Sequence, residues 1–432
     1  MTRDEFPYTT TSWDTGSPSL TAPLSHDIDV DVAVVGGGFV GLSSARALKE
    51  ADPSLRIAVL EAEHLGFGAS GRGSGMIVPF LHSAGSVARV FGWDEARWAA
   101  RYLIDQAGAL KEFIRAESIA CDYQYSPLIV AATNDNQAQW LKQRSFELSR
   151  CGYEVEVLAA EQLRELVGYP TKAGIIIRDE SFGQLQPFAL AQGFSEVIRR
   201  KGVQVYEHTL VQRFDIHPDK VALLTHEGAT VTAQKLVLAA GAQIRKLGWG
   251  RFRLFPIAVH SYMLATEPLD GATLEELGSG LATASVIDAG PSFYYLRTFQ
   301  NRLLIGGAAA MFSKADEAAD RDVKQYRKVL AELHRRFPFL KEASLAAAWA
   351  GPIQSNLTEL PTVQSLPNSP NVVLNVAYVN GVPLSYLAGR LIVGLVLGSS
   401  YADPEVERLR RVFDRTGHSL SELFRFGLAL VR

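Results

Sequence analysis

Near the start of the chain, the order of apolar and polar residues predicts a strand, a helix and a second strand in close succession. Residues 32–35 form an apolar run, residues 42–48 place small and apolar side chains at helical spacing, and residues 57–60 form a second apolar run. Strands and helices that alternate in this way pack as parallel βαβ units. The pattern therefore predicts one βαβ unit over residues 28–61.

The rest of the chain divides into extended and helical segments by the same criterion. Apolar runs predict strands over residues 123–131, 203–206, 209–216, 220–226, 235–242, 255–267, 292–298, 302–306 and 371–376. Apolar residues at a spacing of three and four predict helices over residues 94–117, 136–150, 160–167, 187–200, 318–336 and 383–397. A turn over residues 298–301 joins two of the strands as a hairpin.

The order of these segments predicts a discontinuous architecture. At 432 residues the chain is too long for one simple core. Because βαβ material begins the chain, a strand-loop-helix unit nearly closes it, and antiparallel material lies between, we expect an α/β plus α+β fold: a Rossmann-like nucleotide-binding domain with an inserted antiparallel-sheet substrate domain. The expected segments are an arm over 1–27, the nucleotide-binding domain over 28–90, 152–255 and 346–400, the substrate domain over 91–151 and 256–345, and a helical segment over 401–432.

Glycines at the first strand-to-helix turn follow the G-x-G-x-x-G spacing, at Gly36, Gly38 and Gly41. The first permits the tight turn, the second lets a pyrophosphate approach the backbone, and the third lets the helix pack on the strand. Glu61 lies 20 residues beyond Gly41, where a carboxylate can bind both ribose hydroxyls of an adenosine. The helix N-terminus adds unpaired N–H groups for the phosphates. We therefore predict dinucleotide binding, with a purely structural tight turn as the alternative.

A glycine-rich loop, GFGASGRGSGM at residues 66–76, follows the second strand. Loops of this composition let the backbone approach a ligand closely. The loop is therefore expected beside the nucleotide.

Composition and charge exclude several classes of protein. The net charge of −3 gives no basic field for nucleic acid. No run of about 18 uncharged apolar residues predicts a membrane span, and no apolar segment near the N-terminus resembles a signal peptide, so a cytoplasmic location is expected. Cys121 and Cys151 are too few for a disulfide framework or a structural zinc site, and we expect two reduced thiols.

Motifs spread over nearly the whole chain resemble one family. The chain resembles the FAD-dependent amine and amino-acid oxidoreductases of the D-amino-acid oxidase type, and among them most the gamma-glutamylputrescine oxidase group. The motifs that carry the resemblance are VAVVGGGFVGLSSARAL, VLEAEHLGFGASGR, KLVLAAGA, AVHSYMLATEPL, SFYYLRTFQNRLLIGG and NGVPLSYLAGRLIVGLVLG. The resemblance implies FAD, and since neither cysteine matches a flavin-linking position, the FAD is expected to be noncovalent.

The resemblance also implies which residues contact FAD. The pyrophosphate would lie on the first glycine turn, the adenosine ribose on the acid that follows the second strand, and the flavin along the glycine-rich loop and the last strand-to-helix turn. Val211 would contact the adenine end through its backbone. The residues implied are Gly36, Gly38, Phe39, Val40, Gly41, Glu61, Ala62, Gly68, Ala69, Ser70, Gly71, Arg72, Val211, Ala240, Gly241, Asn380, Gly381 and Val382.

Four side chains are candidates for the substrate site. His82 follows the glycine-rich loop, and either borders the active site or is an ordinary loop histidine. Tyr262 either lines the pocket or packs in the core. Alternation on the hairpin places Tyr295 and Arg297 on one face, where the arginine either grips a substrate carboxylate or forms a surface ion pair.

The expected reaction is oxidation of the C–N bond of a small amine or amino acid to an imine, by hydride transfer to flavin N5. No G-x-S-x-G or H-E-x-x-H motif points to other chemistry. Oxygen or another electron acceptor would reoxidise the flavin, and the oligomeric state is left open. The alternative is a flavoprotein of the same fold without turnover, used for binding or assembly.

Overall fold

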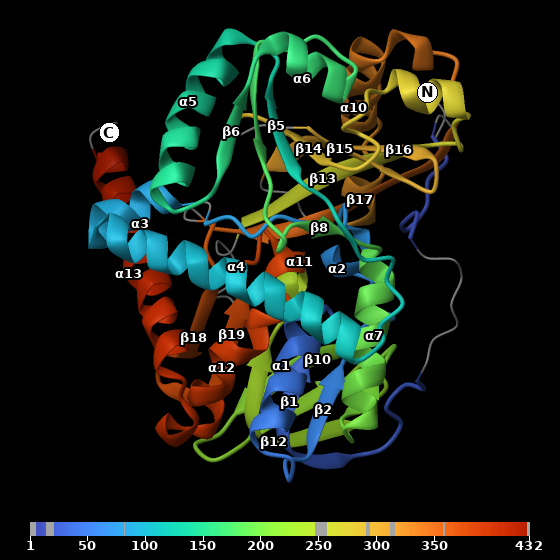
Figure 1. Ribbon diagram of the computed structural model, residues 1–432. Helices are drawn as coiled ribbons and strands as arrows, with labels where there is room; N and C mark the ends of the chain where they lie inside the picture. The colour runs from blue at the N-terminus through green and yellow to red at the C-terminus, as the bar shows by residue number, and fades with distance from the viewer. Residues whose placement is uncertain are drawn as a thin grey trace.

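A computed structural model describes residues 6–13, 21–81, 83–246, 257–290, 294–311, 316–356 and 359–429. Two large sheets lie one above the other in Figure 1, and the long helix α4 (Trp93–Ala116) crosses the molecule between them. The lower sheet carries the βαβ unit, and the upper sheet is the inserted one. The predicted architecture, a Rossmann-like domain with an inserted, largely antiparallel sheet, is confirmed.

The first sheet is parallel at its centre. Its strands are β1 (Ile28–Val35), β2 (Ile57–Leu60), β9 (Gln204–Tyr206), β10 (Val211–Ile216), β11 (Val221–Thr225), β12 (Thr230–Leu238), β18 (Thr362–Leu366) and β19 (Ser369–Val376). Their order is β10-β11-β12-β1-β2-β9, with β19 parallel to β12 and β18 beside β19. Val35 is level with Leu238 and with Leu60. Three parallel strands therefore end at one edge, where ligands of open α/β sheets bind.

Helices α1 (Phe39–Ala51), α7 (Pro187–Arg200) and α12 (Leu387–Leu397) cover one face of this sheet (Figure 1). The strands beneath them are almost wholly buried, because parallel strands covered by helices are apolar on both faces. α1 and α12 approach closely at Gly389, where a side chain would overlap the carbonyl oxygen of Ser43. Residues from the two ends of the chain thus complete one domain.

The second sheet is antiparallel except for one strand pair. Its strands are β5 (Leu128–Ala132), β6 (Val155–Leu158), β7 (Ala173–Ile177), β13 (Ile257–Thr266), β14 (Ser285–Asp288), β15 (Tyr295–Phe299), β16 (Arg302–Met311) and β17 (Leu345–Ser355). Their order is β17-β13-β16-β15-β14-β5-β7-β6, with β5 and β14 parallel. A small third sheet joins β3 (Met76–Ile77), β8 (Gly183–Gln184) and β4 (Gln124–Tyr125).

Two segments form strands in a different sheet from the one that the predicted domain boundaries imply. Residues 155–177 and 346–355 were expected in the nucleotide-binding domain, and their strands β6, β7 and β17 pair with the second sheet instead. The apolar pattern of a strand is local, whereas its sheet depends on long-range pairing. The helix expected over 318–336 is also interrupted, and forms α9 (Glu317–Asp320) and α10 (Val323–Arg336).

The remaining helices surround the sheets. They are α2 (Ala69–Arg72), α3 (Ala84–Phe91), α5 (Asp135–Arg150), α6 (Ala160–Val167), α8 (Gly271–Glu276), α11 (Gly381–Leu384) and α13 (Pro404–Ala429), with 3₁₀ turns η1 (Gly241–Lys246), η3 (Pro338–Leu340) and η4 (Ser399–Tyr401). Within the described ranges, no helix has both the length and the apolar character that a membrane crossing requires.

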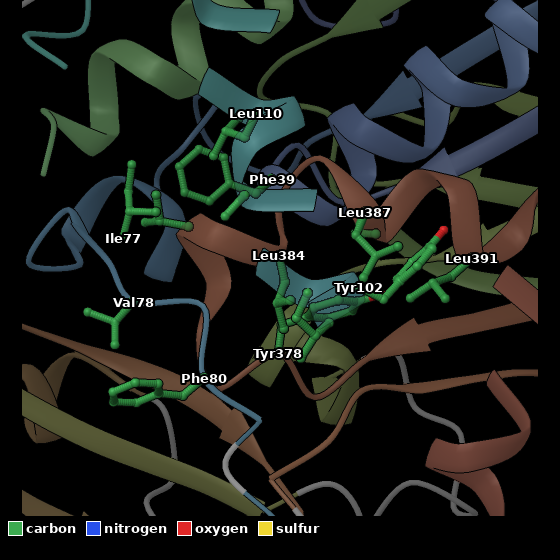
Figure 2. Close-up of a cluster of buried hydrophobic side chains, with 14 of the residues drawn as sticks. Phe39, Ile77, Val78, Phe80, Tyr102, Leu110, Tyr378, Leu384, Leu387 and Leu391 are labelled. Carbon is green, nitrogen blue, oxygen red and sulfur yellow. The ribbon is translucent and has the colours of Figure 1, made fainter. Parts of the chain in front are cut away.

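An apolar cluster fills the space between α1, α4 and the two helices that follow β19 (Figure 2). Phe39, Ile77, Leu110, Leu384 and Leu387 belong to this cluster and come from five different elements. Burial of side chains of this size typically contributes about 1.5–3 kcal/mol each. The cluster fixes α11 relative to α1, and so ties the last strand-to-helix turn to the first.

Candidate cofactor and substrate site

The first strand-to-helix turn can be built only with glycines. Gly36 has φ +113°, and a Cβ there would lie 2.5 Å from the carbonyl oxygen of Ala239. A side chain at Gly41 would overlap the carbonyl oxygen of Gly36. Both constraints match the roles predicted for these glycines, namely the tight turn and the close contact of helix and strand.

Ser70 joins the glycine-rich loop to the N-terminus of α1. Its Oγ accepts a hydrogen bond from the N–H of Phe39 at 2.9 Å, and it is the first atom that a Cβ at Gly38 would meet. Helix geometry leaves the other N–H groups of the first turn, including that of Val40, without intrahelical partners. The structure thus brings the glycine-rich loop to the first glycine turn, at a helix N-terminus suited to binding phosphate.

Glu61 lies at the carboxyl end of β2 and takes part in the turn. Its two carboxylate oxygens accept hydrogen bonds from the N–H groups of Gly37 at 2.6 Å and Glu63 at 3.0 Å. Burial raises the pKa of Glu61, and the two hydrogen bonds oppose that rise. A carboxylate has about four lone-pair sites, so Glu61 retains acceptor sites for ribose hydroxyls. The adjoining Ala62 is exposed.

The remaining predicted nucleotide contacts lie along the same sheet edge. The chain leading into Val211 passes over Glu61, whose carbonyl oxygen accepts a hydrogen bond from the N–H of Thr209 at 2.7 Å. Ala240 and Gly241 follow the end of β12, and Gly241 has a left-handed φ of +52°. The structure therefore brings these residues near the first glycine turn.

The glycine-rich loop forms the short helix α2, which begins after Gly68 and contains Ala69 and Gly71. A side chain at Gly71 would overlap the carbonyl oxygen of Gly66, so the loop is tightly wound there. The guanidinium of Arg72, which is expected beside the cofactor, donates to the carbonyl oxygens of Phe67 and Ala350.

Arg72 also belongs to a buried polar group between the two domains. Its Nη1 lies 3.0 Å from Asp320 Oδ2, and Nε2 of His260 lies 2.6 Å from the other carboxylate oxygen. Burial alone would raise the pKa of Asp320. The hydrogen bond with His260 and the charge of Arg72 outweigh this effect and lower that pKa. The sequence singled out neither His260 nor Asp320, because only the fold brings them to Arg72.

The last strand-to-helix turn is held next to the strand that leaves the glycine-rich loop. The side-chain amide of Asn380 donates to the carbonyl oxygen of Val78. Gly381 begins α11, and Val382 behind it is buried in the apolar cluster. The three predicted flavin contacts therefore lie on one ordered turn.

The residues present fit a dinucleotide. A Cβ placed at Gly68, Gly241 or Gly381 would meet no atom within 4 Å, so these glycines border open space after the ends of β2, β12 and β19. The same edge offers an acidic acceptor, Glu61, and the N–H groups of a helix N-terminus. These are the groups that a ribose and a pyrophosphate need, and they would hold the adenosine and phosphate parts of FAD.

One face of the second sheet is turned to the glycine-rich loop. Trp349 of β17 donates from Nε1 to the carbonyl oxygen of Arg72 at 2.8 Å, and its register partner on β13 is Met263. On the same face, the hydroxyl oxygens of Ser261 and Tyr295 lie 2.9 Å apart. Burial raises the pKa of Tyr295 to about 12. The face thus presents neutral hydroxyls among apolar side chains.

Of the other candidates for the substrate site, Tyr262 lies on the opposite face of β13 from Ser261. Its hydroxyl donates to the carbonyl oxygen of Ala319 at 2.9 Å, and its ring packs edge-on against Tyr326. Strand alternation separates Tyr262 from Ser261, but only the pairing of β13 with its neighbours shows which of them faces the loop. His82 lies outside the described residues.

Arg297 is on the same face as Tyr295, as alternation predicts, but it is fully buried. Its Nη1 donates to the carbonyl oxygens of Ser74 and Leu185, both at 2.9 Å. Neither the predicted carboxylate grip nor a surface ion pair describes this environment, in which the partners are backbone carbonyls.

Two further sequence expectations concern thiols and metals. Cys121 and Cys151 are both free and buried, and burial raises the pKa of both thiols. Across the part of the chain that the structure describes, no three His, Cys, Asp or Glu side chains gather in a way that could hold a metal ion.

Comparison with known proteins gives a consistent result. The family model described as DAO, FAD dependent oxidoreductase, matches residues 31–395. The chain is 31% identical over 400 residues to the gamma-glutamylputrescine oxidoreductase of Escherichia coli (strain K12). The aligned region covers 90% of each chain. Among solved structures, glycine oxidase from Geobacillus kaustophilus superposes with a TM-score of 0.71 at 23% identity, covering 85% of this chain and 95% of that one. The L-proline dehydrogenase of P. horikoshii gives a TM-score of 0.70 at 17% identity, covering 91% and 99%. The two structural likenesses support the fold.

Proposed function

The chain belongs to the DAO family of FAD-dependent oxidoreductases, and from that premise we propose that it oxidises the C–N bond of a small amine or amino acid to an imine. FAD, when bound, supplies the hydride acceptor for such a reaction. The names of the relatives support the substrate class, since they refer to gamma-glutamylputrescine, glycine and L-proline. A whole-chain match at 31% identity supports the class of reaction more than the individual substrate.

The observation that carries the proposal is the pair of hydroxyls on Ser261 and Tyr295, which lie 2.9 Å apart on the sheet face turned to the glycine-rich loop. Because burial raises its pKa to about 12, Tyr295 stays protonated and neutral at physiological pH. Ser261 is neutral at any pH of interest. The pair therefore offers both a donor and an acceptor to a substrate nitrogen from two groups that are themselves neutral.

Neutral hydroxyl groups suit the chemistry of amine oxidation. The carbon next to nitrogen gives up a hydride only when the nitrogen lone pair is free, so the substrate must react as the neutral amine. Moving an ammonium ion among partly buried neutral groups costs desolvation energy, which lowers the pKa of the bound amine. We infer that Ser261 and Tyr295 orient the nitrogen, while Met263 and Trp349 exclude water. Water then hydrolyses the released imine.

The proposal is tested by anaerobic titration of the FAD-bound protein, which should be yellow, with a panel of amines and amino acids. At least one compound should bleach the flavin absorbance, and deuterium on the carbon next to nitrogen should slow that bleaching if hydride transfer limits it. Replacement of Tyr295 by Phe should raise the substrate concentration required. A broad panel that never bleaches the flavin would favour the alternative, a flavoprotein without turnover.

Reoxidation and location are further parts of the proposal. After anaerobic reduction, mixing with oxygen or with an artificial acceptor such as a quinone separates an oxidase from a dehydrogenase by the rate at which the yellow colour returns. The cytoplasmic location expected from the sequence stays a prediction, which cell fractionation tests.

A further inference from the structure

Five successive carbonyl oxygens of the glycine-rich loop, from Gly71 to Gly75, are hydrogen-bonded to protein groups outside the loop. This is unusual, because loops of this kind normally leave several carbonyl oxygens to water. The donors, in order along the loop, are Thr11 Oγ1 at 2.9 Å, Trp349 Nε1 at 2.8 Å, Trp13 Nε1 at 2.8 Å, Arg297 Nη1 at 2.9 Å and the N–H of Leu185 at 2.9 Å. Two of the five come from the N-terminal arm.

Residues 6–13 of the arm are themselves held by the second sheet. The N–H of Thr9 donates to the carbonyl oxygen of Ala348 at 3.0 Å, and the N–H of Ala348 donates to that of Pro7 at 2.8 Å. The arm therefore adds to the free edge of β17. The carbonyl oxygen of Trp13 in turn accepts a hydrogen bond from Nε2 of Gln186 at 2.7 Å. The arm predicted over residues 1–27 thus packs, in its part from residue 6 to residue 13, on the second sheet.

Trp13 is 2% exposed and covers the most buried cation of this region. Its ring centroid lies 5.6 Å from the guanidinium carbon of Arg297, and 5.0 Å from the ring of Phe299. Among the described residues, Nη2 of Arg297 has no hydrogen-bond partner, and burial lowers the pKa of Arg297 to about 9. Trp13 thus keeps water from a cation that holds the loop.

Fixing these carbonyls also fixes the N–H groups that follow them. A peptide unit is planar and trans, so the C=O of one residue and the N–H of the next point in opposite directions. With the carbonyl oxygens of Gly73 and Ser74 directed at Trp13 and Arg297, the N–H groups of Ser74 and Gly75 point away from both. Within the described ranges neither N–H donates to another residue, so both can donate to a ligand.

We propose that Trp13 is a positioning residue of the cofactor site, and that the N-terminal arm, through Trp13 and Thr11, sets the peptide planes whose N–H groups face the bound flavin. The inference rests on the placement of FAD along the glycine-rich loop. It adds to the site a segment that lies before the βαβ unit in the sequence. Because binding linkage is reciprocal, FAD must also stabilise the arm.

The test compares Trp13→Phe with the purified holoprotein. Phenylalanine retains most of the ring packing and removes the N–H, so the dissociation constant for FAD should rise about threefold to tenfold, as expected for one hydrogen bond. The visible absorption band and the reduction potential of the flavin should also shift. Trp140→Phe is the matched control, since Trp140 is 37% exposed on α5, and it should leave all three unchanged.

A second measurement uses the unaltered protein. Addition of FAD to the stripped protein should slow amide hydrogen exchange in residues 6–13. Unchanged exchange there, or wild-type affinity and spectrum in Trp13→Phe, would overturn the inference. A loss of thermal stability in FAD-free Trp13→Phe, without any change in spectrum or potential, would overturn it too, by assigning Trp13 a merely structural role. Failure of the wild-type protein to bind FAD would instead count against the proposed function.

Discussion

Arg72 and Asp320 form an ion pair across the two domains, with Nη1 of the arginine 3.0 Å from Oδ2 of the aspartate. Arg72 ends the short helix of the glycine-rich loop, and Asp320 ends α9 beside the second sheet. His260 shares the carboxylate at 2.6 Å. The pair therefore links the position of the glycine-rich loop to the second sheet.

Asp320→Asn should lower the free energy of unfolding at pH 7 by about 1–3 kcal/mol, because it leaves the buried guanidinium of Arg72 without its charged partner. The folded protein holds the pKa of Asp320 below its ordinary value of 3.8, so the stabilisation is present above that value and is lost as the pH falls through the folded pKa. Urea unfolding of both proteins between about pH 7 and pH 3 should show the difference shrinking toward acid.

The matched control for this prediction is Asp219→Asn, since Asp219 is an exposed turn residue. It should change the unfolding free energy by less than about 0.5 kcal/mol. A difference between wild type and Asp320→Asn that stays constant down to pH 3 would contradict the charged pairing.

Glu61→Gln should weaken FAD binding at least about tenfold. A hydrogen bond from a ribose hydroxyl to a charged acceptor is worth about 1.5–3 kcal/mol. Glu61 is expected to accept two such bonds, and the substitution removes the charge from both. Because burial raises the pKa of Glu61, the wild-type protein should also lose FAD affinity on acidification before an exposed glutamate would protonate. Fluorescence titration of FAD measures both effects.

Glu63→Gln serves as the control for Glu61→Gln, since Glu63 is exposed two residues away. Equal loss of affinity in the two variants would argue against ribose binding by Glu61. The same preparation tests the noncovalent state of the cofactor, since acid precipitation should release free FAD into the supernatant.

Gly381→Val should reduce FAD affinity or shift the flavin reduction potential while leaving the fold intact. A Cβ at Gly381 would meet no protein atom within 4 Å, so the side chain would occupy space in front of α11 that we assign to the cofactor. Gly271→Val, at an equally open position on α8, provides the comparison. Thermal unfolding of the FAD-free forms should be similar, and unchanged FAD binding in Gly381→Val would refute the placement.

The rate of flavin reduction should rise with pH and follow the pKa of the substrate amine, because only the neutral amine reacts. Tyr295 contributes no titration below about pH 11, since burial raises its pKa to about 12. In Tyr295→Phe the midpoint of the pH profile should therefore remain in place, while the half-saturating amine concentration increases. A midpoint that disappears in this variant would identify Tyr295 as the titrating group.

Local geometry explains what could be predicted from the residues alone. Gly36 and Gly41 occupy positions where any side chain would overlap a backbone carbonyl, and Glu61 follows β2 directly. The turn and its acid are therefore defined within one βαβ unit. Likewise, a helix such as α7 was predicted with its observed bounds, because its start and its apolar face are encoded within the segment.

Tertiary structure alone decided the rest, because each case depends on segments far apart in the chain. Strand alternation cannot say which face of β13 meets the loop, and pairing places Ser261 rather than Tyr262 on it. Arg297 could not be recognised as a buried donor to Ser74, 223 residues away. The partners of the N-terminal arm, the edge of β17 and the carbonyl of Gly73, could not be identified from the sequence because they lie far from the arm along the chain.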